Sequence, residues 1–266
     1  MKKKFLAFFA ILTALVFCAC GATPSADEIL TGTAETEMQA FSVTETVTEE
    51  IPLTTKQESL QLPDVSAQLM TEYFEEVVLR TEYSDGEGNS SLVQKWEMPI
   101  HYRIHGDATA EDLRILNSLF EVLNGIEGFP GIEPAAEEEV ENLSIHFADP
   151  EEFDELFFEF LQGEDAVGAA RYWYYTDTND MYEGKIGYRT DIDQSIRNSV
   201  LPEEIINVLG ITDTVLREDS IVYQHSNFNT ELSDVDLVIL KLLYHPSIPC
   251  GSDAAFCRQR IAELYR

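Results

Sequence analysis

Hydrophobic residues beyond Leu62 fall into short runs with two different periods, which predicts a domain that mixes helices and strands. Between Trp96 and Ile104, apolar and polar residues alternate, as they do in a strand with one buried face. The same alternation, together with turn signals such as Asp85-Gly86, predicts strands over residues 76–83, 96–104, 143–147, 166–176 and 184–190.

Capping residues mark the expected helices. Thr109 with Asp112 resembles a capping box, which marks the start of a helix. Gly210 is expected to follow the end of a helix in the left-handed backbone conformation. Pro202 is expected to break or restart the helix that contains it, because it lacks a backbone N–H. The predicted helices cover residues 67–74, 110–124, 150–160, 195–209, 233–244 and 254–265. The pattern indicates an α+β domain with a mixed sheet and packed helices over residues 63–266.

Residues 20–62 precede this domain and have a different composition. They are rich in Thr, Glu, Ser and Ala, and their few large apolar residues keep no period. Such a segment cannot bury enough apolar surface to offset the entropy of ordering. We therefore expect a disordered acidic tether that begins at Cys20.

Residues 1–19 have the features of a lipoprotein signal peptide. Three lysines at positions 2–4 precede an apolar stretch, 5–17, that is too short for a bilayer core needing about twenty residues. Cys20 follows Ala19 and fits a lipobox, whereas Cys18 follows the bulky Phe17. The sequence thus predicts a lipid on Cys20 that anchors the protein to the outer face of the bacterial cytoplasmic membrane. Ordinary secretion with soluble release is the alternative.

The charge of the chain excludes one class of partner. Its formal net charge is −32, so phosphate backbones should be repelled and nucleic-acid binding is not expected. Hydrophobic residues make up 44% of the chain, which is too many for a chain disordered throughout. A protein, peptide or glycan of the cell envelope remains as the expected partner.

Candidate chemistry is concentrated in residues 203–213. This segment matches the metalloprotease pattern H-E-x-x-H-x-x-G-x-x-H at the glutamate and the glycine, but at none of the three histidines. Glu203 and Asn207 take the first two ligand positions, four residues apart on one helical face. Asp213 takes the third ligand position. Glu204 stands where the general base would be.

The next segment adds two weaker signals. Residues 219–223 stand where a methionine-containing turn would lie beneath such a site, although they contain no methionine. Ser233 with Asp236 makes a second capping box, with Leu232 and Leu237 spaced as a hydrophobic staple. This helix start, with its later Leu-Tyr pair, resembles the C-terminal helix of matrixin-type metzincins.

From about residue 98 to 248 the chain is similar to domain-of-unknown-function family 2927, found among bacterial lipoproteins. The resemblance is carried by residues 203–210 and 232–246, where the family shows E-E-x-x-Q-x-L-G-L and L-T-x-x-D with a later L-L-Y-D-P. Asn207 replaces the glutamine here, and His245 replaces the aspartate. The resemblance implies a zincin-like α+β fold and a secreted location, and it implies no activity.

The type of ligand atom separates two function classes. Glu203, Asn207 and Asp213 offer only oxygens, whereas catalytic zinc is held mainly by imidazole or thiolate, so zinc is disfavoured and no metal is assigned. A hard cation such as calcium would suit oxygens better. The favoured interpretation is a catalytically degenerate zincin-like binding module, and the alternative is an atypical metal-dependent hydrolase with Glu204 as general base. Acidic residues in the first turn of a helix also interact favourably with the helix dipole, which is the structural alternative for Glu203 and Glu204.

Two cysteines remain beyond the signal peptide and lipobox. In an oxidising exterior, Cys250 and Cys257 are close enough in sequence to close a short loop, so a disulfide between them is expected.

The remaining candidate groups favour structural interpretations. His101 and His105 would lie about 13 Å apart on a strand, so they are expected on a solvated polar face rather than on a metal. The aromatic residues 172–175 suggest a carbohydrate-stacking platform, but core packing is the more usual role of such strands.

Overall fold

The computed structural model describes residues 60–80, 92–161, 166–225 and 228–266, all of them within one compact unit. The expected signal peptide, Cys20 and most of the expected tether lie outside these residues. Leu60 and Leu62 already pack against the core, just before the expected domain start at residue 63. Within the described part of the chain, no helix is long and apolar enough to cross a membrane.

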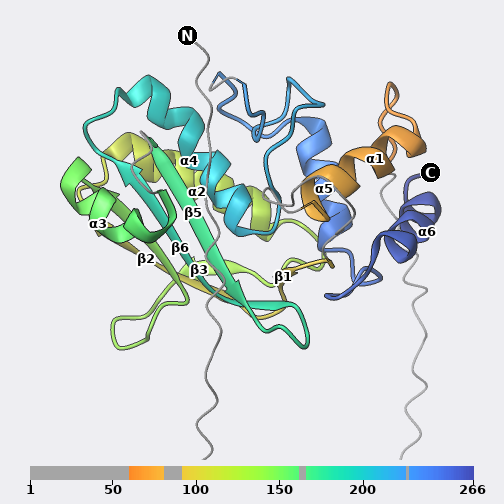
Figure 1. Ribbon diagram of the computed structural model, residues 1–266, viewed down its shortest axis with the longest axis horizontal. Helices are drawn as coiled ribbons and strands as arrows, with labels where there is room; N and C mark the ends of the chain where they lie inside the picture. The colour runs from red at the N-terminus through yellow and green to blue at the C-terminus, as the bar shows by residue number, and fades with distance from the viewer. Residues whose placement is uncertain (1–59, 81–91, 162–165, 226–227) are drawn as a thin grey trace, which may run out of the picture. The chain divides into compact units, whose positions relative to one another are not determined.

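A mixed, mostly parallel sheet forms the centre of the domain (Figure 1). Its parallel strands lie in the order β6-β4-β2-β3, and β5 runs antiparallel along the other side of β6. The two-residue strand β1 pairs with the start of β6. The strands are β1 (Lys95–Trp96), β2 (Ile100–Gly106), β3 (Ile132–Pro134), β4 (Leu143–Ala148), β5 (Gly168–Tyr174) and β6 (Asp180–Arg189).

Helices cover both faces of the sheet. Gly184 and Gly187 of β6 have opposite parity, so they face opposite sides. A Cβ on Gly184 would lie 2.8 Å from Val208 of α4 (Gln194–Val208), and one on Gly187 would lie 2.3 Å from Phe157 of α3 (Pro150–Leu161). The helix α2 (Ala110–Asn124) packs beside α4, as Figure 1 shows. The predicted mixed sheet with packed helices is confirmed.

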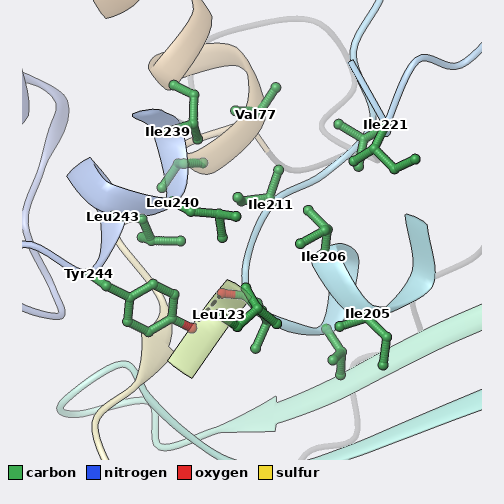
Figure 2. Close-up of a cluster of buried hydrophobic side chains, with 14 of the residues drawn as sticks. Val77, Leu123, Ile205, Ile206, Ile211, Ile221, Ile239, Leu240, Leu243 and Tyr244 are labelled. Atoms are coloured by element: carbon green, nitrogen blue, oxygen red, sulfur yellow. Dashed lines mark hydrogen bonds between the residues drawn. The ribbon is translucent and has the colours of Figure 1, made fainter. Parts of the chain in front are cut away.

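Three further helices complete the core: α1 (Ala67–Val78), α5 (Asp234–Leu243) and α6 (Ala254–Leu264). Figure 2 shows Ile239 and Leu240 of α5 lying near Val77 of α1, with Ile206 of α4 close by. All four side chains are almost completely buried. This cluster joins α1 and α5 to α4.

The predicted strand over residues 76–83 is wrong at its start. Helix α1 continues to Val78, and residues 81–83 lie outside the described residues. Val77 and Val78 extend the buried stripe that begins with Met70, Tyr73 and Phe74. The spacing of three and four residues is helical, so two adjacent valines continue a helix rather than begin a strand.

The predicted break at Pro202 is also wrong, because α4 runs through it. Proline removes one helical hydrogen bond at this point. Its neighbours Val200, Leu201, Ile205 and Ile206 are each at most 2% exposed. Tertiary burial of this helix therefore outweighs the lost hydrogen bond.

Candidate functional site

The four predicted site residues, Glu203, Glu204, Asn207 and Asp213, lie at the C-terminal half of α4 and just after it; we call them the α4 site. The amide Nδ2 of Asn207 donates to Oδ1 of Asp213 over 3.5 Å. The structure thus brings the second and third ligand positions together. All four residues are partly buried.

A glycine turn returns the chain toward α4. Gly210 has a φ of +100°, and a Cβ there would lie 2.4 Å from the carbonyl oxygen of Gln94. Only glycine fits both the backbone angle and this close approach. Thr212 then donates its N–H to the carbonyl of Val77 over 2.7 Å, which fixes the segment that carries Asp213.

Glu204 lies against the edge strand β5. A Cβ on Gly168 would lie 2.8 Å from Oε1 of Glu204, so the glycine makes room for the carboxyl side chain. Gly168 pairs with Tyr188 in the sheet, and the Tyr188 hydroxyl donates to the carbonyl of Leu201 over 2.8 Å. Burial raises the pKa of Tyr188 well above its ordinary value, and the negative charges of Glu204 and Glu203 add to this shift.

The turn at residues 219–223 is fixed by a buried hydrogen-bond network. Asp236 accepts from the Ser220 hydroxyl over 2.6 Å and from the Ile221 N–H over 3.0 Å. The hydroxyl of Tyr73 donates to Ser220 over 2.9 Å. Asp236 also completes the predicted capping box with Ser233, so one carboxylate starts α5 and holds the turn. Its role in the turn was not predicted from the sequence.

The donor set of the α4 site does not fit zinc. Its potential ligands are carboxylate and amide oxygens, and no imidazole or thiolate stands at the three ligand positions. The Asn207 amide nitrogen faces Asp213, while the buried Oδ1 of Asn207 has no hydrogen-bond partner among the described residues. The site therefore offers oxygen acceptors rather than a zinc-binding geometry.

A second cluster of ligand-type side chains was not predicted from the sequence. Ligand atoms of Glu97, Asp180 and Cys250 lie within 4.8 Å of one another. The buried ammonium of Lys95 lies 3.6 Å from Glu97 and donates to the carbonyls of Leu243 and Ile248. Because Lys95 supplies the positive charge, we assign no metal to this cluster. The three residues come from distant segments, so no spacing motif could reveal them.

The predicted disulfide is absent from the structure, in which Cys250 and Cys257 are free thiols. The thiol of Cys250 donates to the carbonyl of Lys95 over 3.5 Å, whereas Cys257 packs into the main core from α6. Burial raises the pKa of each thiol to about 12, and Asp180 adds to the shift at Cys250. Both groups are therefore protonated at neutral pH.

The strand histidines, His101 and His105, are partly exposed and contact acidic residues. Nε2 of His105 lies 3.0 Å from Glu141, and its ring stacks on His146 with centroids 4.7 Å apart. His101 contacts Glu139. Burial lowers the pKa of His146 to about 4, with His105 as the next cause, so this ring is neutral at neutral pH. Both histidines lie on β2, as the strand prediction requires, and both are partly exposed on its polar face.

The aromatic residues of β5 do not form one platform. Tyr172 and Tyr174 pack against the core, while Trp173 has the opposite parity and stacks under Arg171 at 4.9 Å. Tyr175 follows the strand and contacts Tyr182 in a tilted arrangement, with ring centroids 4.5 Å apart. The split between two faces supports core packing over a carbohydrate-stacking surface.

Comparison with known proteins places the domain in a family. No curated protein matches the chain. Residues 67–262, well over half of the 266 residues, match the family described as "Protein of unknown function (DUF2927)". The match begins at the first residue of α1, ends within α6 and includes the α4 site. The chain therefore belongs to DUF2927.

Proposed function

We propose that this domain is a binding module of the cell envelope, anchored by a lipid on Cys20, that captures an extended polypeptide along β5. The observation that carries the proposal is the position of β5 at the edge of the sheet. β5 has seven residues and pairs only with β6 among the described strands. A strand at the edge of a sheet can accept an incoming strand through its outer backbone groups.

The opposite edge of the sheet is less suitable for strand addition. There β3 has three residues and ends in Pro134, with the exposed Glu133 beside it. Short length, proline and charge are the usual ways in which proteins protect an edge. The contrast between β3 and β5 favours β5 as the docking edge.

We also propose a zincin-like layout without zinc. Helix α4 carries the ligand positions, the turn at Gly210 returns Asp213 to Asn207, and α5 begins with its capping box. Without imidazole ligands, no tightly bound zinc is expected to activate water beside Glu204. Binding is therefore favoured over hydrolysis.

Hydrogen exchange tests strand capture directly. The full chain is incubated with a panel of extended peptides and with the same peptides N-methylated at alternate residues. Amide exchange in β5 should slow with an unmodified peptide and stay unchanged with its N-methylated counterpart, because added ladder hydrogen bonds need free N–H groups. Unchanged exchange in β5 with every peptide would contradict the proposal.

The alternative function, a metal-dependent hydrolase, can be tested separately. Metal analysis of natively purified protein and peptide-cleavage assays of the Glu204→Gln variant test it. A stoichiometric transition metal together with a cleavage activity lost in Glu204→Gln would replace the binding module by a hydrolase.

Fatty-acid labelling in cells tests the anchor. The wild-type chain should take up the label and fractionate with the membrane, and Cys20→Ser should do neither. Cys18→Ser is the matched control and should behave as wild type. Labelling of the Cys20→Ser variant would contradict the lipid assignment.

A further inference from the structure

We infer that a hollow between α2, α4 and the start of α5 binds a small molecule that has an apolar body and an amide N–H. We call it the α2–α4 hollow. Its volume is about 390 Å³, which lies within the range of about 300–1,000 Å³ that small-molecule sites usually have. Binding here is a further function, separate from strand capture at β5 and not dependent on it.

Apolar side chains from two helices line the hollow. Leu119 and Val122 come from α2, and Leu232 and Leu237 come from the start of α5, where they are spaced as a hydrophobic staple. Val122 is 44% exposed, which is unusual for a large apolar side chain beside a core. A ligand that covers these side chains removes apolar surface from water, so an apolar body is favoured.

The α4 wall carries a backbone carbonyl that lacks its helical donor. In an α-helix the carbonyl of residue 198 accepts from the N–H of residue 202, but residue 202 is proline and has no N–H. Asn198 and Pro202 lie one turn apart, and both line the hollow. The side-chain oxygen of Asn198 accepts from Gln194 over 2.9 Å, whereas among the described residues no side chain donates to its backbone carbonyl.

The missing donor defines the polar part of the ligand. A carbonyl beside buried apolar surface is stabilised by a hydrogen bond, and an amide N–H of a ligand can supply it. Pro202 therefore has a consequence beyond the helix: it leaves an acceptor at the edge of an apolar hollow. A ligand that offers only acceptors cannot use this carbonyl.

The charges at the hollow disfavour an anion. Arg114 is the one basic residue of the lining, and its Nε and Nη2 both donate to Glu111. This hydrogen bonding raises the pKa of Arg114, and the charge of Glu231, also in the lining, adds to the shift. Two carboxylates thus balance one guanidinium, and the net charge of −32 repels an anion at longer range.

Three probes with the same body test the ligand chemistry: phenylbutanamide, its N,N-dimethylamide, and phenylbutanoate. Their affinities for the full chain are measured by ligand-observed NMR titration. The primary amide should bind about three- to tenfold more tightly than the dimethylamide, as one net hydrogen bond allows. The carboxylate, which has no N–H and carries a negative charge, should bind most weakly. Equal affinities of the two amides would overturn the donor assignment.

A carbonyl label locates the hydrogen bond. With ¹³C in the asparagine carbonyls, the Asn198 signal should move downfield on addition of the primary amide and stay in place with the dimethylamide. An Asn198 signal that does not respond to saturating primary amide would overturn the site.

Pro202→Ala tests the origin of the acceptor. The new N–H can complete the helical hydrogen bond to Asn198, so the preference for the primary amide over the dimethylamide should disappear. The ratio of the two affinities is compared, because alanine also widens the hollow. Pro150→Ala is the matched control: Pro150 is the first residue of α3, where its N–H would have no helical acceptor, and the ratio should be preserved. A ratio that survives Pro202→Ala would overturn the role of the carbonyl.

A surface substitution tests the apolar wall without disturbing the core. Val122→Gln should weaken both amides alike, whereas Leu113→Gln, at an exposed position of α2 outside the hollow, should weaken neither. Circular dichroism and thermal melts confirm that each variant folds. Equal effects of the two substitutions would overturn the placement of the ligand in the α2–α4 hollow.

Discussion

The guanidinium of Arg197 lies 3.0 Å from the carboxylate of Asp112, and this ion pair joins the first turns of α4 and α2 in the protein interior. Asp112 is fully buried and also accepts from the backbone N–H of Thr109 and from Gln194. Arg197 further donates to the carbonyls of Thr190 and Ile192, at 3.3 Å each. The pair therefore positions the start of the helix that carries the α4 site.

Replacing Arg197 by methionine should lower the free energy of unfolding by about 3–5 kcal/mol, because it leaves the carboxylate of Asp112 buried without its ion partner. Urea denaturation measures the change. The matched control is Arg114→Met, which breaks an exposed pair with Glu111 and should cost no more than about 1 kcal/mol. Equal losses in the two variants would contradict the prediction.

The same pair should make stability depend on acid. Burial opposes ionisation of Asp112, but hydrogen bonds from Gln194 and Arg197 prevail and hold its pKa below the ordinary value. A lowered folded pKa gives stability that is present above the unfolded pKa of about 4 and is lost as pH falls through the folded pKa. Asp112→Asn should remove this part of the pH dependence in urea melts from pH 7 to pH 3. If the stability of Asp112→Asn depended on pH as the wild type does, the prediction would be contradicted.

The sequence predicted local boundaries better than long-range contacts. Both capping boxes, at Thr109 and Ser233, and the left-handed Gly210 are confirmed, because such signals depend only on neighbouring residues. The predicted strand over residues 96–104 instead divides at Pro99 into β1 and β2. The continuous helix through Pro202 depends on burial from other elements, which no local pattern contains.

At the candidate site, too, local features could be predicted from the sequence and long-range contacts could not. The i, i+4 spacing placed Glu203 and Asn207 on one turn of α4, and the structure adds the contact between Asn207 and Asp213. The role of Gly168 beside Glu204 could not be predicted, because it depends on how β5 lies against α4. Contacts between distant segments, such as those of Lys95 with Leu243 and Ile248, likewise cannot be predicted from residue spacing.

Ser220→Ala should destabilise the turn beside the α4 site. It removes the partner of the Tyr73 hydroxyl and one hydrogen bond to Asp236, in a buried setting where an unsatisfied polar group costs about 1–3 kcal/mol. Chemical denaturation measures the loss. Ser118→Ala on the exposed side of α2 is the control and should stay within about 0.5 kcal/mol of wild type. A neutral Ser220→Ala would show that the network contributes little.

Gly210→Ala should cost at least about 2 kcal/mol of unfolding free energy. An L-residue in the left-handed region costs about 1–2 kcal/mol, and the new Cβ would also collide with the carbonyl of Gln94. Gly125→Ala is the matched control, since Gly125 has a φ of −81° and its nearest Cβ contact is 3.3 Å. Thermal melts compare the two variants, and similar melting temperatures would contradict the expected strain.

Cys250 and Cys257 should resist alkylation in the folded protein. Their pKa values of about 12 leave very little thiolate at neutral pH, and thiolate is the reactive form. Peptide mass mapping after iodoacetamide should show slow labelling of both cysteines in native protein and rapid labelling in urea, with no effect of prior reduction. A mass two hydrogens lower before reduction would instead reveal a disulfide.

The hydroxyl of Tyr265, just after α6, accepts from the backbone N–H of Leu62 and donates to the carbonyl of Val65, each over 3.0 Å. One phenol thus ties the last residues of the domain to the point where the chain enters it. If the polypeptide is pulled from its N-terminal side, as a membrane anchor would pull it, the load passes first into the seam between α1 and α6. The sheet edge and α4 lie beyond that seam along the chain, so tension on the N-terminal side reaches α1 and α6 before it reaches them.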